Sequence, residues 1–179
     1  MTYNELYQEV CRLGFEGDVY PKDSFLFATR RAMLQMAYDL PDERRFTLKL
    51  MPSDQPTVVY LASHLSNLLY AVGAESKTDR TLSVRITEDT LFLSHVPAGD
   101  IEVRYVHRPS EVSGTDENER IDVVKSRVHL LPLLVASYVF LEDEPERSQY
   151  YLTLYRDAML RMGSVRPSYT TPYADVLGW

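Results

Sequence analysis

The feature that most constrains the fold is a run of fourteen residues without formal charge, residues 128–141. A helix over this run is apolar on nearly every side, so other elements must cover it. We predict that residues 121–141 form a long buried helix at the centre of the domain, capped by Asp122. Pro132 should kink this helix because proline cannot donate the helical hydrogen bond. A segment built of packing residues favours a role in assembly over catalysis.

Length and composition predict one domain, with or without an inserted lobe. The chain has 179 residues, of which 45% are hydrophobic, and this is enough to bury a substantial core. The single Cys11 excludes an intrachain disulfide and a multi-cysteine zinc site, and we expect it to be a buried, inert thiol in a reducing compartment.

The net charge of −7 argues against a broad basic face that grips nucleic acid. It leaves open a surface that DNA passes without being held. The chain starts without a basic region followed by an apolar run, and the apolar part of residues 121–141 is short for a bilayer span. We therefore expect a soluble intracellular protein without a membrane partner.

Periodicity predicts helices at both ends of the sequence. Apolar residues recur at three- and four-residue spacing through residues 2–40, with a Thr2/Glu5 capping box at the start and Pro41 at the end. In the last helix, which reaches residue 162, Pro145 should lie in the first turn, where a missing amide costs little.

The period changes to two between the helical segments. Alternating apolar residues at 46–50, 82–93 and 101–106 predict an antiparallel β lobe of four or five strands over residues 44–108, with a hairpin at 82–93. Residues 57–74 fit a strand in one half and a short helix in the other, so they are left unassigned. Residues 110–120 are polar and connect the sheet back to the helices.

Together these patterns predict an α+β fold that is mainly helical. N- and C-terminal helical hairpins, residues 2–40 and 121–162, form a bundle with the antiparallel β lobe 44–108 inserted between them. Residues 1–163 form the single domain. Residues 164–179 contain prolines and aromatic residues without a period, which predicts an extended C-terminal tail.

The polar residues predict no catalytic, cofactor or metal site. The four histidines are scattered along the chain: His64, His95, His107 and His129. None has a second ligand at a metal-binding spacing, and the glycines form no phosphate-binding loop. We expect His129 to be a hydrogen-bonded core residue and the strand-end residues His95 and His107 to lie near solvent. Ser94 and His95, like Ser63 and His64, are neighbours in sequence only, which does not orient a base toward a hydroxyl.

Clustered carboxylates occur at residues 116–119 and 142–146. Favourable charge at helix N-termini is sufficient to explain both clusters. The functional alternative is that Glu142, Asp143 and Glu144 project toward a neighbouring subunit or line a channel. Repeated around a ring, they would repel DNA phosphate and keep the DNA mobile.

Thirteen tyrosines are many for a chain of this length. Tyrosine buries a large area at low rotamer cost and keeps a polar tip, which suits protein interfaces. Tyr3, Tyr7, Tyr151 and Tyr155 also lie on helical stripes that packing within one domain would fill, so core and interface roles both stay open.

Several segments resemble the head-to-tail adaptor (connector) proteins of tailed bacteriophages. They are residues 1–6, 12–15, 101–109, 130–138, 141–146 and 150–156. The resemblance implies a helical bundle with a β insertion and a homo-oligomeric ring of twelve copies at the virion neck, between capsid and tail, assembled in the host cytoplasm. One face would bind the portal protein and the other a stopper or tail-completion protein.

The resemblance also implies a channel through which DNA passes without specific binding, with Glu142, Asp143 and Glu144 as channel or rim charge. The tail would be a docking arm for the portal or a neighbouring subunit, through Tyr169, Tyr173 and Trp179. A plain disordered terminus is the alternative for this segment.

Two other classes of function stay open. A scaffold or regulatory module of a cellular assembly would use the same helices for a partner protein, and portal and capsid genes next door would argue against it. An enzyme with an unfamiliar site would show a pocket that holds two or more of the histidines with Asp or Glu.

Overall fold

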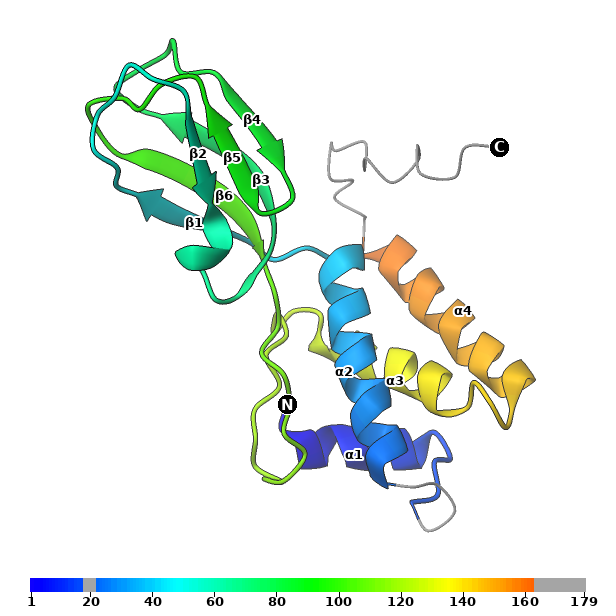
Figure 1. Ribbon diagram of the computed structural model, residues 1–179. Helices are drawn as coiled ribbons and strands as arrows, with labels where there is room; N and C mark the ends of the chain where they lie inside the picture. Colours follow the sequence, from blue (N-terminus) through cyan, green and yellow to red (C-terminus); the bar gives the residue numbers. More distant parts are fainter. Residues whose placement is uncertain (18–21, 163–179) are drawn as a thin grey trace.

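The computed structural model describes residues 1–17 and 22–162, which form a helical lobe and a β lobe (Figure 1). The helical lobe contains α1 (Tyr3–Arg12), α2 (Lys22–Asp39), α3 (Leu131–Val139) and α4 (Pro145–Arg161), with the short 3-10 helix η2 (Val128–Leu130) before α3. The β lobe contains β1 (Glu43–Leu48), β2 (Thr57–Tyr60), the 3-10 helix η1 (Leu61–Ser63), β3 (Leu68–Ser76), β4 (Val84–Thr87), β5 (Thr90–Leu93) and β6 (Ile101–His107). The chain enters the β lobe after α2 and returns from it before η2.

The prediction of a mainly helical bundle is wrong. The described residues form an α+β fold with four α-helices and two three-stranded antiparallel sheets, in the orders β1-β6-β3 and β2-β5-β4. Part of the error lies in residues 57–74, which contribute β2, η1 and most of β3. In the structure, β2 pairs with β5 and β3 pairs with β6, and both partners come later in the sequence. The local pattern alone therefore could not decide between strand and helix for these residues.

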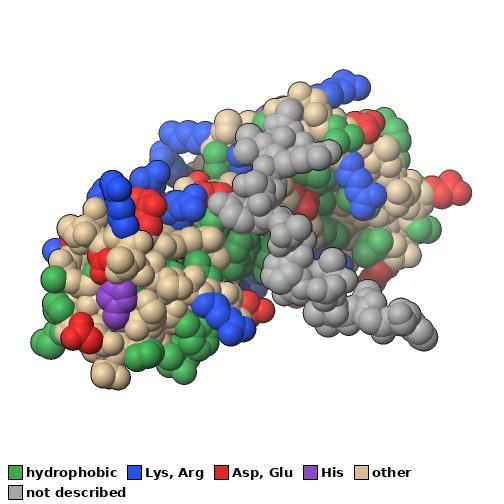
Figure 2. Space-filling view, turned by 90° about the horizontal axis from the view of Figure 1, so that it is seen from above, with side chains coloured by type: hydrophobic (Ala, Val, Ile, Leu, Met, Phe, Trp, Pro, Cys, Tyr) green, Lys and Arg blue, Asp and Glu red, His purple; other side chains and the backbone are tan. Residues whose placement is uncertain are grey.

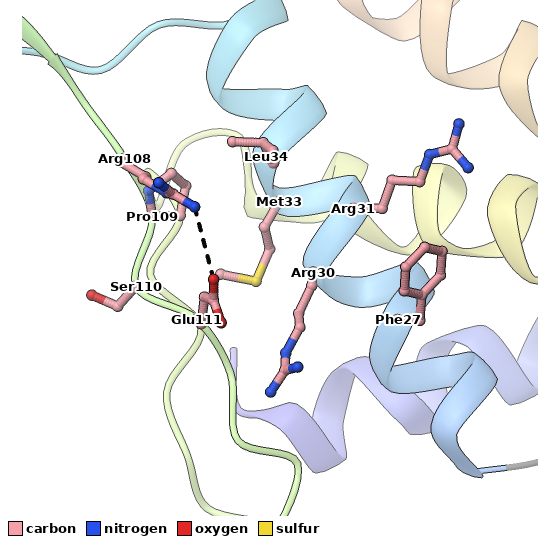
Figure 3. A pocket seen from close by; sticks show the side chains of 9 residues that line it. All are labelled: Phe27, Arg30, Arg31, Met33, Leu34, Arg108, Pro109, Ser110 and Glu111. Carbon is pink, nitrogen blue, oxygen red and sulfur yellow. Dashed lines mark ion pairs between the residues drawn. The ribbon is translucent and has the colours of Figure 1, made fainter. Parts of the chain in front are cut away.

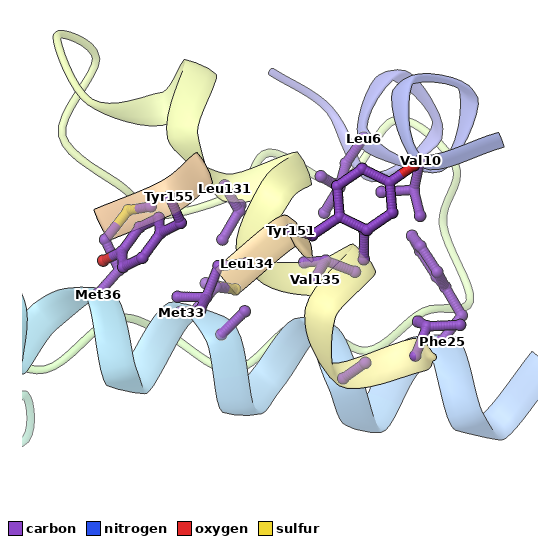
Figure 4. Packing of buried hydrophobic residues seen from close by; sticks show 14 of the residues in the cluster. Leu6, Val10, Phe25, Met33, Met36, Leu131, Leu134, Val135, Tyr151 and Tyr155 are labelled. Atoms are coloured by element: carbon purple, nitrogen blue, oxygen red, sulfur yellow. The ribbon is translucent and has the colours of Figure 1, made fainter. Parts of the chain in front are cut away.

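α3 lies at the centre of the helical lobe, and α1, α2 and α4 pack on it (Figure 4). Leu131, Leu134, Val135 and Ala136 are fully buried, because almost every side of this helix is apolar and needs cover. The predicted buried central helix is therefore confirmed over Leu131–Val139.

The predicted length of that helix is wrong. Residues 121–127 are not helical, and Pro132 lies in the first turn of α3, where it breaks no hydrogen bond and produces no kink. Asp122 is not a helix cap, because its carboxylate instead accepts hydrogen bonds from His107 and Ser110. Tertiary contacts thus determine the conformation of this segment.

The local helix signals are confirmed where the neighbouring residues suffice to define them. The Thr2 hydroxyl accepts a hydrogen bond from the Glu5 amide, and the Glu5 carboxylate accepts one from the Thr2 amide, which completes the predicted capping box. Pro145 is the first residue of α4, as predicted. The connection over residues 110–120 runs beside the start of α1, where the Tyr3 amide donates to the Glu119 carbonyl at 2.8 Å.

The two sheets of the β lobe share one apolar core. Leu48, Ile101 and Val103 from one sheet contact Leu91 and Leu93 from the other, and all five are buried. The predicted hairpin is present as β4 and β5, joined by a turn in which Glu88 has a φ of 48°. The helical lobe has a separate core, so the two lobes bury their apolar residues independently.

The chain enters and leaves the β lobe at one place, because β1 pairs antiparallel with β6. There the His107 amide donates to the Asp42 carbonyl at 3.0 Å. Tyr38 of α2 stacks on Tyr70 of β3, with 6.2 Å between ring centroids, and this contact also joins the lobes. Within residues 1–17 and 22–162, none of the helices has the length and apolar character that crossing a bilayer requires.

Candidate protein-interaction surfaces

The acidic turn between α3 and α4 projects from the helical lobe on the side away from the β lobe (Figure 1). Glu142 and Asp143 are exposed, while Glu144 is half-buried and its Oε2 lies 3.1 Å from Arg147 Nη1. Leu141, beside the two exposed carboxylates, is 46% exposed. The turn therefore presents an apolar side chain together with negative charge.

Arg147 holds this turn against the rest of the helical lobe. Its guanidinium lies over the Phe140 ring, 4.1 Å from the centroid, and donates to the Leu13 carbonyl at 2.8 Å. The planar guanidinium thus contacts a ring, a carbonyl and the Glu144 carboxylate at once.

The three predicted contact residues of the tail, Tyr169, Tyr173 and Trp179, lie outside the described residues. The last described turn of α4 exposes Leu160 and Met162.

A groove that was not predicted from the sequence lies between α2 and residues 108–111, which lead from β6 into the connection (Figure 3). Its volume is about 280 Å³. From α2 it is lined by Phe27, Arg30, Arg31, Met33 and Leu34, and from the segment after β6 by Arg108, Pro109, Ser110 and Glu111. Phe27, at 66% exposed, and Leu34 give it an apolar floor that faces solvent. We call this feature the α2 groove.

A signal for the α2 groove is present in the sequence. Phe27, Leu34 and Tyr38 recur at seven- and four-residue intervals, which places them on one face of α2. This face differs from the one that Ala32, Met33 and Met36 bury, so α2 carries a second, exposed apolar stripe. The other wall could not be predicted, because residues 108–111 are about 80 positions further along the chain.

The β lobe also exposes apolar side chains. Val58 of β2 lies opposite Phe92 of β5 in the sheet register, and Tyr60, two residues further along β2, is 65% exposed. Residues two apart on a strand share a face, so these three side chains lie on the outer face of the sheet β2-β5-β4. Both lobes therefore carry exposed apolar surface.

The histidines differ from their predicted environments. His129 is exposed instead of lying in the core, because the segment before α3 is a short 3-10 turn and not part of a buried helix. His107 is buried instead of lying near solvent, and its Nε2 lies 2.8 Å from Asp122 Oδ2. Among the described residues, nothing forms a hydrogen bond with the buried His107 Nδ1.

His107 and Asp122 line a second cavity of about 280 Å³ at the junction of the lobes. Met33 and Met36 of α2 line its floor. Arg127 also lines it, and its guanidinium donates to the Leu40 carbonyl at 2.7 Å. The cavity holds one histidine, whereas the enzyme alternative called for two or more. Its polar groups mainly fasten one lobe to the other.

Ser94 and His95 are more than neighbours in sequence, and this prediction is wrong. Ser94 Oγ lies 2.9 Å from His95 Nδ1, and His95 Nε2 lies 2.7 Å from Asp79 Oδ2. The hydrogen bonds from Thr81, and then that from His95, lower the pKa of Asp79 to about 2. Ser94 Oγ also accepts the Ser83 amide at 3.1 Å, so the network fastens the loop before β4 to the end of β5.

Charge on the surface is mixed. Figure 2 shows basic and acidic side chains interspersed on the face that it displays, outside the grey residues. Among residues 1–17 and 22–162, no three His, Cys, Asp or Glu side chains are grouped as metal ligands. Cys11 is half-buried, against the helical core.

No protein-family model matches this chain, and a search of curated proteins found no match.

Proposed function

We propose that this protein is a virion structural protein, a head-to-tail adaptor that forms a ring, joins the portal to the tail and leaves a channel for DNA. The observation that carries the proposal is that large apolar side chains are exposed on both lobes, in the α2 groove and on the outer face of sheet β2-β5-β4. A protein that bridges neighbours on different sides needs separate contact surfaces of this kind.

The resemblance in sequence supports the same conclusion. Three of its segments coincide with α3, the acidic turn and the middle of α4. The adaptor would act through geometry: a modest contact repeated around a closed ring gives strong attachment through multivalency. It needs no catalytic centre and no cofactor.

The acidic turn and the tail have distinct roles in this proposal. Glu142, Asp143 and Glu144 would supply negative charge at a subunit contact or at the channel, where they would keep DNA phosphate from binding. Tyr169, Tyr173 and Trp179 would dock the tail onto the portal or a neighbouring subunit, where aromatic side chains give large contact area. The stopper or tail-completion protein would bind the opposite face of the ring.

The test is the particle mass of the full-length protein, alone and with the portal protein encoded by the same genome. Twelve copies at 20.7 kDa each would give a ring of about 250 kDa. Cryo-electron micrographs of the particle should show a ring with a central opening, seated on the portal in the mixture.

A chain that stays monomeric alone and never joins the portal would contradict the proposal. If a monomer instead formed a stable complex with a cellular protein, the scaffold or regulatory alternative would replace it. The control is the portal protein without the adaptor, which must not produce the additional ring by itself.

A further inference from the structure

The rim of the α2 groove is basic. Arg30, Arg31 and Arg108 surround its apolar floor, and Glu111 is the one acidic residue among those that line it. The Arg108–Glu111 pair is long, at 3.8 Å, and both side chains are more than half exposed, so it neutralises Arg108 only weakly. The groove therefore combines apolar surface with a net positive rim.

Two of these arginines are held in place for binding. The Arg30 side chain donates through Nε to the Val112 carbonyl at 2.9 Å, which fixes the distance between α2 and the connection. The Arg31 guanidinium lies over the Tyr138 ring, 4.6 Å from the centroid. Stacking on a ring leaves the N–H groups at the edge of a guanidinium able to bind a carboxylate.

The acidic turn has the complementary character. Leu141, Glu142 and Asp143 are all exposed, so an apolar side chain is followed directly by two carboxylates. Arg147 and the Phe140 ring brace the turn from behind, which keeps its shape fixed before any contact forms. It is a preformed projection with the charge that the α2 groove lacks.

We infer that the acidic turn of one copy of this chain binds in the α2 groove of the next copy. Leu141 packs against Phe27 and Leu34, while Glu142 and Asp143 pair with Arg31 and Arg108. This inference rests on the proposed function and names the subunit contact that the ring needs.

The positions of the two surfaces suit such a contact. The groove adjoins the connection that leads to the β lobe, whereas the turn lies on the side of the helical lobe away from it (Figures 1 and 3). Two different surfaces on different sides of one chain make a heterologous contact, which repeats from copy to copy and closes into a ring when the rotation allows.

The test uses two full-length charge-reversal variants. The turn variant carries Glu142→Arg and Asp143→Arg, and the groove variant carries Arg31→Glu and Arg108→Glu. Each alone places like charges across the contact, so each should stay monomeric at concentrations where the wild type forms its ring. An equal mixture should assemble with the two variants alternating around the ring. The basic turn of the turn variant then meets the acidic groove of the groove variant, and the acidic turn of the groove variant meets the basic groove of the turn variant.

The matched control carries Asp54→Arg and Asp100→Arg, two exposed aspartates of the β lobe. It shifts the formal charge as much as the turn variant does, and it should assemble like the wild type. Circular dichroism of each variant checks that it is folded, and mass photometry measures the particles with and without the portal protein.

A folded turn variant that assembles like the wild type would overturn this inference and leave the proposed function standing. A mixture of two folded variants that does not assemble would overturn it as well. If the chain's own tail or the portal occupied the groove instead, the turn variant would assemble like the wild type. Failure of the wild type to form a ring, alone or on the portal, would instead count against the proposed function.

Discussion

His107 Nε2 lies 2.8 Å from Asp122 Oδ2, and this contact ties the last strand of the β lobe to the segment that leads into α3. The same carboxylate oxygen accepts the Ser110 amide at 3.0 Å and the Ser110 hydroxyl at 3.1 Å. One side chain thus fixes the path of the chain on both sides of the 110–120 connection. The junction of the two lobes depends on it.

Replacing Asp122 by alanine should lower the free energy of unfolding by about 1.5–3 kcal/mol, because the buried His107 ring loses its partner. Urea denaturation measures this, with Asp100→Ala, at an exposed position, as the control that should change it by less than about 0.5 kcal/mol. Equal effects of the two substitutions would show that the His107–Asp122 contact contributes nothing to stability.

The Asp122 contribution should also depend on pH. Burial acts to raise the pKa of Asp122, but the hydrogen bonds from Ser110 and His107 outweigh it and hold the pKa below its usual range. A carboxylate whose pKa is lower in the folded than in the unfolded protein stabilises the fold at pH values above the unfolded-state pKa of about 3.9. This stabilisation is lost as the pH falls below that value. The difference between wild type and Asp122→Ala should therefore shrink when urea denaturation is repeated near the acid limit of folding.

Arg147→Lys should destabilise the helical lobe by about 1–3 kcal/mol although it keeps the charge. An ammonium cannot cover the Phe140 ring as a planar guanidinium does while it also donates to the Leu13 carbonyl and Glu144. Arg156→Lys, at an exposed position on the same helix, is the matched control. Thermal melts of both variants give the comparison, and identical melting temperatures would refute the bracing role of Arg147.

Tyr155 should stay protonated in the folded protein at pH values where ordinary tyrosines ionise. Its ring is 1% exposed and its hydroxyl donates to Asp39 Oδ2 at 3.0 Å, so burial first, and then the Asp39 charge, raise the pKa of Tyr155. Because the pKa of Tyr155 is higher in the folded than in the unfolded protein, its protonated form stabilises the fold. This contribution is complete at pH values below the unfolded-state pKa of about 10 and is lost as the pH rises above it.

Absorbance at the tyrosinate band tests this in the folded protein. Tyr155→Phe should leave the native alkaline titration unchanged up to the onset of unfolding. A native titration in which Tyr155→Phe removes the signal of one tyrosine would contradict the expectation.

Leu134→Ala should cost about 2–5 kcal/mol, because Leu134 lies fully buried in α3 and its loss leaves a cavity where α2 and α4 meet that helix. Leu160→Ala, at an exposed position of α4, makes the same chemical change and should cost less than about 0.5 kcal/mol. Chemical denaturation compares the two. Similar midpoints would mean that α3 is not the centre of the core.

The parts of the fold that the sequence predicted well are those whose signals are local. The Thr2/Glu5 capping box, the hairpin of β4 and β5, and Pro145 at the start of α4 each need only residues within a few positions. The 121–141 helix was predicted too long because distant partners hold residues 121–127: Asp122 accepts from Ser110 and Arg127 donates to the Leu40 carbonyl.

The candidate site was predictable only on one of its two sides. The exposed acidic turn follows directly from the charges after the apolar run, whereas the α2 groove needs α2 and residues 108–111 to meet, which no local pattern predicts. The Ser94–His95–Asp79 network was missed for the same reason, since Asp79 lies on another loop. The predicted tail contacts stay predictions, because they lie outside the described residues.

The antiparallel pairing of β1 with β6 brings both ends of the β lobe to a single attachment point. A short linker there could replace the whole lobe while the apolar core around α3 stayed intact. The length and surface of the β lobe can therefore change, and with them the partner on that side, without disturbing the core of the helical lobe.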